Sequence, residues 1–164
     1  MVRLIVALLL GSLAYVPAAV AQRIEAVVER VKDGDSLVVR RNLLGRKSEL
    51  RMAGIDAPER NQPWGRQAKS ALEAMVLNRR VTVQVTDRDR YGRLVARVWT
   101  GQTYVNAAMA EGGHAWAFSR YLKDRQIGEA ANRARLQRRG LWALPPSQRI
   151  PPPAWREQHP RRPN

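Results

Sequence analysis

The chain has no cysteine and only two histidines among its 164 residues. Without cysteine it can form no disulfide, no zinc–thiolate site and no catalytic thiol. His114 and His159 have no partner at the spacing of a metal-binding pair, so we assign neither of them a chemical role. A metal bound by this chain would therefore take oxygen ligands, which favours a hard cation over zinc or copper.

Acidic residues are also scarce: the chain has 14 Asp and Glu against 29 Lys and Arg, which gives a formal net charge of +15 at pH 7. A field of this sign attracts nucleic acid, although charge alone also suits an anionic membrane surface or a merely soluble cationic protein. Six of the acids gather in three short segments, where either a cation site or duty in turns and caps would explain them. They are Asp33, Asp35, Asp56, Glu59, Asp87 and Asp89.

One long apolar run is present, over residues 4–20, and it follows Arg3 and ends in the small-x-small site Ala19-Val20-Ala21. We expect residues 1–21 to be a secretory signal peptide that is removed on export to the periplasm or the medium. An uncleaved anchor helix is the weaker alternative, since the run is near the lower length for a membrane span and contains a proline. The mature chain is expected to have no transmembrane segment and no stable protein partner, and to be a monomer.

Periodicity in the remaining chain favours an α+β fold that is mainly β. Alternating β-branched residues predict strands over 24–32, 36–40, 47–55, 81–85 and 93–99, and helical spacing predicts helices over 63–78, 105–111 and 120–139. Five strands with a helix between the third and the fourth are typical of an OB-fold barrel with about three helices, although other α+β sheets would also fit. We expect one domain over residues 22–142, and a disordered tail rich in proline and arginine over residues 143–164.

The stretch 50–59 is central, because it is an apolar strand that ends in Asp-Ala-Pro-Glu. The proline stops the strand, which then presents Asp56 and Glu59 beside Arg51. A straight strand would place Arg51 and Asp56 on opposite faces, so we expect a bend, most simply at Gly54. Carboxylates for a hard cation beside guanidinium groups for phosphate suit phosphodiester chemistry.

Three segments, 33–36, 51–59 and 89–93, carry the motifs Asp-Gly-Asp-Ser, Arg-x-x-Gly-Ile-Asp-Ala-Pro-Glu and Asp-Arg-Tyr-Gly-Arg. Their order and spacing resemble the staphylococcal nuclease (thermonuclease) family, as does Gly-Leu-Trp at 140–142 after a basic helix. Each motif is common by itself, but the ordered set is specific and covers roughly residues 27–142. The resemblance implies an OB-fold, one Ca²⁺ ion, and endonucleolytic cleavage of DNA and RNA that leaves 3′-phosphate ends.

The resemblance also implies which residues hold the metal and activate water. Asp35 and Asp56 match the carboxylate ligands of the Ca²⁺ ion. Ala57 stands where the family has a threonine that offers its backbone carbonyl, and an alanine carbonyl can serve as well. Glu59 matches the proposed general base.

Two arginines, Arg51 and Arg93, match those that bind the scissile phosphate, and Tyr91 matches a tyrosine close to the nucleotide. Arg90 and Tyr121 are the further substrate-binding candidates. The base-stacking tyrosines of the family align poorly with this sequence, so a stacking role is open to Tyr121 and to two aromatic residues for which core packing is the better explanation, Trp116 and Phe118.

The main alternative function is a non-catalytic OB-fold protein that binds nucleic acid through its basic surface. Against it, the carboxylates of Asp35, Asp56 and Glu59 would repel phosphate unless a cation lay among them. A second alternative is an exported cationic protein whose tail binds anionic surfaces. The acids could also be explained by simple ion pairs, of Asp35 with Arg51 or of Asp56 with Arg93.

Overall fold

The computed structural model describes residues 23–41, 45–118 and 124–160. The predicted signal peptide and the substrate candidate Tyr121 therefore lie outside the described residues. No helix in the described part of the chain is long and apolar enough to cross a membrane. In chain order the elements are β1 (Arg23–Asp33), β2 (Ser36–Arg40), β3 (Lys47–Met52), β4 (Ile55–Asp56), α1 (Gly65–Val76), β5 (Arg80–Arg88), β6 (Leu94–Thr100), β7 (Thr103–Tyr104), α2 (Val105–Glu111), β8 (Trp116–Ala117), α3 (Arg125–Leu136), the 3₁₀ helices η2 (Gly140–Ala143) and η3 (Pro146–Gln148), and α4 (Pro152–Gln158).

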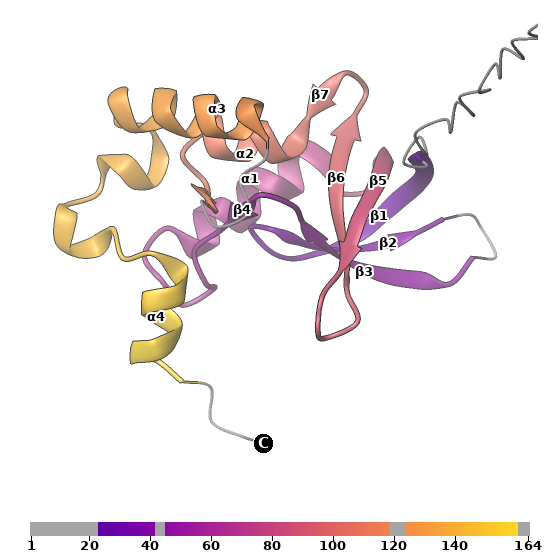
Figure 1. The fold of residues 1–164 in the computed structure, drawn as a ribbon, viewed down its shortest axis with the longest axis horizontal. Coiled ribbons are helices and arrows are strands. Elements are labelled where there is room, and N and C mark those ends of the chain that lie inside the picture. The colour runs from indigo at the N-terminus through magenta and orange to yellow at the C-terminus, as the bar shows by residue number, and fades with distance from the viewer. Residues whose placement is uncertain (1–22, 42–44, 119–123, 161–164) are drawn as a thin grey trace, which may run out of the picture.

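Five of the strands form a closed barrel in the order β3-β2-β1-β5-β6 (Figure 1). Neighbours in this order are antiparallel, and the barrel closes through a parallel pairing of β3 with β6, in which Leu50 faces Leu94. The two-residue strand β7 extends β6, and β4 pairs with β8 as a separate small ribbon. The predicted OB-type barrel is confirmed.

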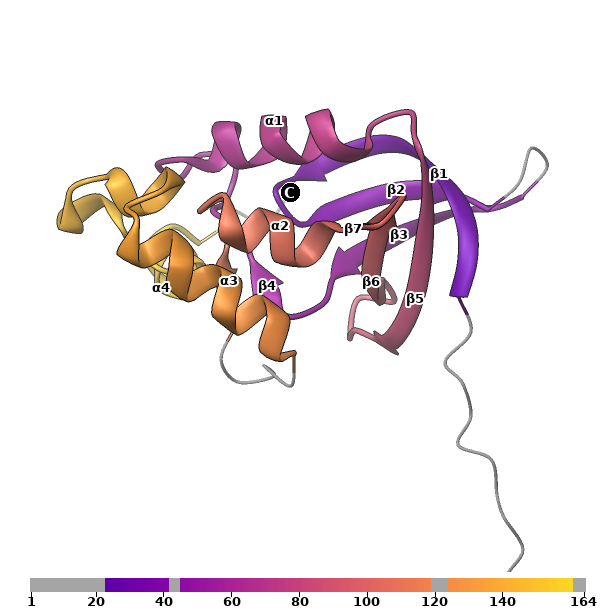
Figure 2. The same ribbon diagram turned by 90° about the horizontal axis from the view of Figure 1, so that it is seen from above.

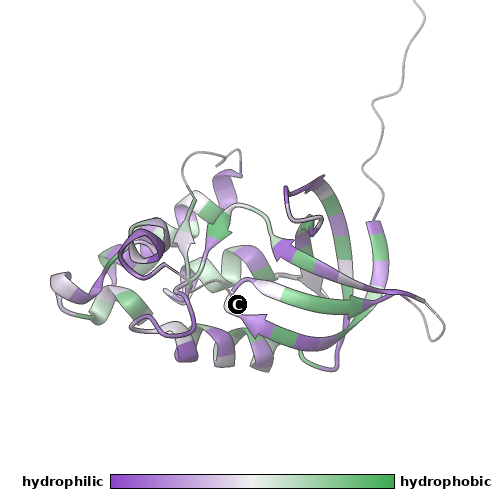
Figure 3. Ribbon diagram, turned by 90° about the horizontal axis from the view of Figure 1, so that it is seen from below, coloured by the Kyte–Doolittle hydropathy of each residue, from purple (hydrophilic) through white to green (hydrophobic). Residues whose placement is uncertain are grey.

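Alternation along the strands builds the core, and Figure 3 shows hydrophobic and hydrophilic residues interleaved in the sheet. The inward residues are almost completely buried, as expected for a closed barrel whose strands have a two-residue period. Helix α1 packs on β1, and α2 packs on β6 and on α3 (Figure 2). The largest fully buried side chains include Val28, Leu37, Leu50, Met52, Leu72 and Met109.

The predicted bend at Gly54 is present and separates β3 from β4. Gly54 has a φ of +75°, a left-handed conformation that side chains rarely adopt. Asn106, which is fully buried, fixes this turn to the barrel, because its amide nitrogen donates to the carbonyl oxygens of Ala53 (2.9 Å) and Ala96 (3.2 Å). Its side-chain oxygen accepts from the N–H of Val98 at 3.0 Å, so the buried amide is satisfied.

The segment after residue 142 differs from the predicted disordered tail. Between residues 143 and 160 it contains η3 and α4, so the described residues hold four α-helices where about three were expected. Prolines at the first positions of α4 suit a helix start, since their fixed φ is already helical, and Pro152 is buried. Figures 1 and 2 place α4 at the end of the molecule where β4 lies. The sequence pattern missed α4 because its partners are far away in the chain.

Candidate active site

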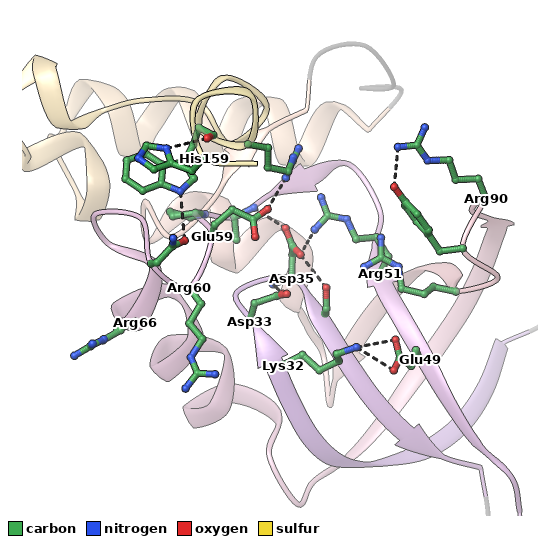
Figure 4. Close-up of a pocket in the computed structure, with 18 residues that line it drawn as sticks. Lys32, Asp33, Asp35, Glu49, Arg51, Glu59, Arg60, Arg66, Arg90 and His159 are labelled. Carbon is green, nitrogen blue, oxygen red and sulfur yellow. Dashed lines mark hydrogen bonds and ion pairs between the residues drawn. The ribbon is translucent and has the colours of Figure 1, made fainter. Parts of the chain in front are cut away.

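A cavity of about 1140 Å³ opens between the β1–β2 turn, β3, the loop after β4, the β5–β6 hairpin and α4 (Figure 4). Its walls carry more basic than acidic side chains, which gives a polyanion several places to bind around an acidic centre. The basic residues are Lys32, Arg51, Arg60, Arg66, Arg90, Arg93 and Arg156.

The acidic centre contains Asp35, which lines the cavity, and Asp56, which contacts the lining residues Arg51 and Arg156; each acid is only 2% exposed. Arg51 pairs with both: its Nη1 reaches Oδ1 of Asp35, and its Nη2 lies 2.7 Å from Oδ1 of Asp56. The barrel sets this contact, because Arg51 on β3 lies opposite Ser36 of β2, next to Asp35. A buried carboxylate needs such a partner, so the two acids and the guanidinium form one unit. The predicted pairing of Asp35 with Arg51 is present.

Asp35 is held by its neighbours as well. The Ala57 N–H donates to its Oδ2 at 2.6 Å, and the Ser36 hydroxyl donates to its Oδ1 at 3.2 Å. A Cβ on Gly34 would stand 2.6 Å from Cβ of Ala57, so the glycine lets the two segments approach each other. The structure thus brings Ala57 to the acidic centre, while a ligand role for its carbonyl remains a prediction.

Glu59 is positioned by Gln62, a buried residue that the sequence analysis did not identify. The Glu59 N–H donates to Oε1 of Gln62 at 3.0 Å, and the Gln62 N–H donates to the Glu59 carbonyl at 2.9 Å. A Cβ on Gly65 would overlap that same carbonyl oxygen, so only glycine fits there. The loop after β4 is therefore fixed before any ligand binds, and no motif in the sequence signalled the glutamine.

Arg93 lies on the β5–β6 hairpin and is held by Asp89 rather than by Asp56. Its Nε donates to Oδ2 of Asp89 at 2.8 Å, and Oδ1 of Asp89 accepts from the N–H groups of Tyr91 (2.9 Å) and Arg93 (3.0 Å). Burial alone would raise the pKa of Asp89, but these bonds outweigh it and hold the pKa below its usual value. Because Asp89 takes Nε, the two terminal nitrogens of Arg93 remain to chelate an oxyanion.

The substrate candidates Arg90 and Tyr91 both line the cavity. Tyr91 is 69% exposed, its hydroxyl accepts from Nη2 of Arg90 at 2.7 Å, and the Arg90 guanidinium lies 4.9 Å from its ring centre. The other two aromatic candidates are not among the lining residues. Trp116 packs edge-on against Trp142, and the Phe118 N–H donates to the Gly54 carbonyl.

Arg156 of α4 is an unanticipated residue of this site. Its Nη2 lies 3.0 Å from Oδ2 of Asp56, and its Nη1 lies 2.8 Å from Oε1 of Glu59. Burial tends to lower the pKa of Arg156, but the bonds to the two carboxylates raise it overall. Asp56 therefore lies between two guanidinium groups, those of Arg51 and Arg156.

Comparison with known proteins agrees with this geometry. The family model for staphylococcal nuclease homologues matches residues 49–144. The chain is 37% identical over 133 residues to an Escherichia coli O157:H7 protein named "Uncharacterized endonuclease", which covers 80% of this chain and 84% of that protein. The chain belongs to the staphylococcal nuclease family. It is also 37% identical over 101 residues to "Probable staphylococcal-like nuclease CAN2" of Oryza sativa subsp. japonica, covering 62% of this chain and 27% of that protein.

Membership in the staphylococcal nuclease family supports a nuclease, a hydrolase that acts on phosphodiester bonds, and suggests dependence on a metal. Two buried carboxylates that converge on one guanidinium can converge on one cation. Within the described residues no group of three or more His, Cys, Asp and Glu forms a metal cage, so other oxygen atoms would have to complete the shell of Asp35 and Asp56. Such an all-oxygen, irregular donor set fits a hard cation.

Proposed function

We propose that this nuclease is an exported, Ca²⁺-dependent endonuclease that cleaves DNA and RNA and leaves 3′-phosphate ends. One observation supports the chemistry above all others: three separate segments converge so that Asp35 and Arg51, which form one buried unit with Asp56, line the same cavity as Glu59 and Arg93. A protein that only binds nucleic acid has no use for three carboxylates in and beside a basic cavity. Export is supported by the apolar run and the small-x-small site before Gln22.

The two arginines would bind the scissile phosphate and stabilise the charge that develops on it. A guanidinium carries five N–H donors, so Arg51 can pair with two carboxylates and still donate to a phosphate oxygen. Arg93 can offer both terminal nitrogens, since Asp89 takes only its Nε. Hydrolysis of a phosphodiester depends mainly on positioning and on stabilising charge, which is what these two side chains supply.

Glu59 would act as the general base. Its carboxylate takes a proton from water while the water oxygen attacks phosphorus, the bond from phosphorus to the 5′ oxygen breaks, and that oxygen gains a proton. This direction of attack leaves the phosphate on the 3′ side. A Ca²⁺ ion held by Asp35, Asp56 and the Ala57 carbonyl would act as a Lewis acid on the phosphate.

The deciding experiment incubates the mature protein with plasmid DNA and with RNA, in Ca²⁺, in Mg²⁺ and in a chelator. We expect cleavage with Ca²⁺, little with Mg²⁺, and none in chelator, with ends that a polymerase extends only after phosphatase treatment. Asp35→Asn should abolish this cleavage. Asp33→Asn is the matched control, because an amide oxygen can still accept the bond that Asp33 now takes from the Asp35 N–H.

Several results would contradict the proposal. Full activity in chelator would exclude the metal site, and binding without cleavage under every condition would favour the non-catalytic alternative. Intact mass of the protein from an exporting host should show a chain that begins at Gln22. A product that keeps Arg3 would contradict cleavage of a signal peptide.

A further inference from the structure

The cavity is lined by aromatic side chains, of which Tyr91 was expected from the sequence and two others were not. Among the residues that the structure describes, the aromatic groups lining it are Tyr91 on the β5–β6 hairpin and Trp155 and His159 on or just after α4. Trp116 and Phe118, which the sequence offered as stacking candidates, are not lining residues. Stacking surfaces for a substrate in this cavity therefore include two on the C-terminal segment.

Trp155 and His159 form a stacked pair one helical turn apart. Their ring centres are 3.8 Å apart and their planes differ by 16°. Contacts at the ring edges fix the pair: the Trp155 indole N–H donates to Oδ1 of Asn61 at 3.3 Å, and Nδ1 of His159 lies 3.1 Å from the Trp155 carbonyl. His159 is exposed. Two parallel rings with their edges tied form a rigid surface that loses little conformational entropy when a third ring is added.

The pair is held close to the groups assigned to the reaction. Arg156 follows Trp155 in the chain and pairs with Asp56 and Glu59, and the Gln62 side chain donates to the carbonyl of Ile150 just before α4. In Figure 4, His159 and Arg90 lie on opposite sides of the cavity, with Glu59, Asp35 and Arg51 between them. A nucleotide chain whose phosphate lies at the centre could thus place a base against α4.

We propose that the Trp155–His159 pair is a base-stacking subsite that selects single-stranded nucleic acid, which rests on the proposed nuclease function. Bases inside a duplex already stack on one another and have no open face, whereas single-strand-binding proteins stack exposed bases on aromatic side chains beside basic grooves. Lys32, Arg60 and Arg66 line the same cavity and supply the basic groove. The subsite favours no particular base, since every base offers a π-face.

The test compares a short oligothymidylate with an abasic oligonucleotide of the same length and charge. Binding is measured by fluorescence anisotropy with a chelator present, so that no cleavage interferes. The intact protein should bind the base-bearing strand about tenfold more tightly, as expected for stacking of one base. A double variant, Trp155→Ala with His159→Ala, should lose most of this preference and bind the abasic strand as the intact protein does.

Two further variants separate stacking from loss of structure. His159→Phe keeps an aromatic ring and should keep the preference, whereas Gln158→Ala changes α4 at a residue that does not line the cavity and should leave both affinities unchanged. Equal affinity of the intact protein for the two strands would overturn the proposal. So would a preference that survives in the double variant, because Tyr91 would then account for it. If the intact protein cleaves plasmid DNA but binds the two strands equally well, the stacking subsite is refuted and the proposed nuclease function is not.

Discussion

The floor of the cavity and its rim are built differently. At the floor, Asp35 and Arg51 line the cavity, Arg51 pairs with Asp35 and with Asp56, and both acids are 2% exposed. At the rim, Tyr91 is 69% exposed and α4 is a seven-residue helix with only Pro152 buried. Burial forces every charge at the floor to have a fixed partner, whereas water screens the rim charges. The floor is therefore set before a ligand arrives, and the rim can adapt to one.

The largest effect should follow a change at the floor. Arg51→Met would leave two buried carboxylates without their shared partner, so we expect the free energy of unfolding to fall by about 3–5 kcal/mol, with loss of cleavage. Urea denaturation and single-turnover cleavage measure the two effects. Arg90→Ala is the rim control and should change stability by less than about 0.5 kcal/mol. An Arg51→Met protein as stable as the parent would contradict the distinction between floor and rim.

A smaller but still large effect, on rate alone, is expected for Arg93→Ala. Loss of a donor to the developing phosphate charge should slow cleavage by about 10²–10³-fold with little change in nucleic-acid affinity. Arg93→Lys should also be poor, because an ammonium group cannot chelate two oxygens. Both variants should fold, because Arg93 pairs with neither of the buried carboxylates at the floor. Circular dichroism checks this. Near-normal single-turnover rates would refute the role of Arg93.

Arg156→Gln tests how a charge at the rim affects binding of a cation at the floor. Removing a positive charge beside Asp56 and Glu59 lowers the repulsion of an incoming cation, so calorimetry should show Ca²⁺ binding tightened by about three- to tenfold. Arg149→Gln removes the same charge at a residue that does not line the cavity, and should leave the Ca²⁺ affinity unchanged. Weaker Ca²⁺ binding by Arg156→Gln would instead mean that Arg156 supports the metal ligands.

The smallest effect concerns His114, which lies beside the loop that carries Glu59. Burial lowers its pKa, and its Nδ1 accepts from the Trp64 indole N–H at 3.2 Å, which requires a neutral ring. As the pH falls, His114 is therefore protonated in the unfolded chain before it is protonated in the folded protein. The free energy of unfolding should decline as the pH falls below about 6.5, the ordinary pKa of histidine. Thermal unfolding from pH 8 to pH 5 measures this, and His114→Gln should flatten the curve. An unchanged slope in that variant would assign the effect to other groups.

Much of the fold was predictable because it depends on local chemistry. A two-residue period predicts a strand wherever one face is buried, and five such segments appear in the barrel. Helix ends were less accurate: α1 begins at Gly65 rather than near residue 63, because Trp64 adopts a φ of 72° and ends the preceding turn. The tail prediction failed because proline-rich composition says nothing of a distant surface on which the segment packs.

The sequence by itself determined the family, the barrel and the charged groups of the three motifs, since motif order and strand periodicity are properties of the chain. Only the tertiary structure decided how these groups pair. In the structure Arg51 pairs with Asp35 and Asp56, and Arg93 pairs with Asp89. Arg156 pairs with Asp56, which is 100 residues away in the chain. A pairing depends on which side chains share a buried space, and closure of the barrel and docking of α4 create that space.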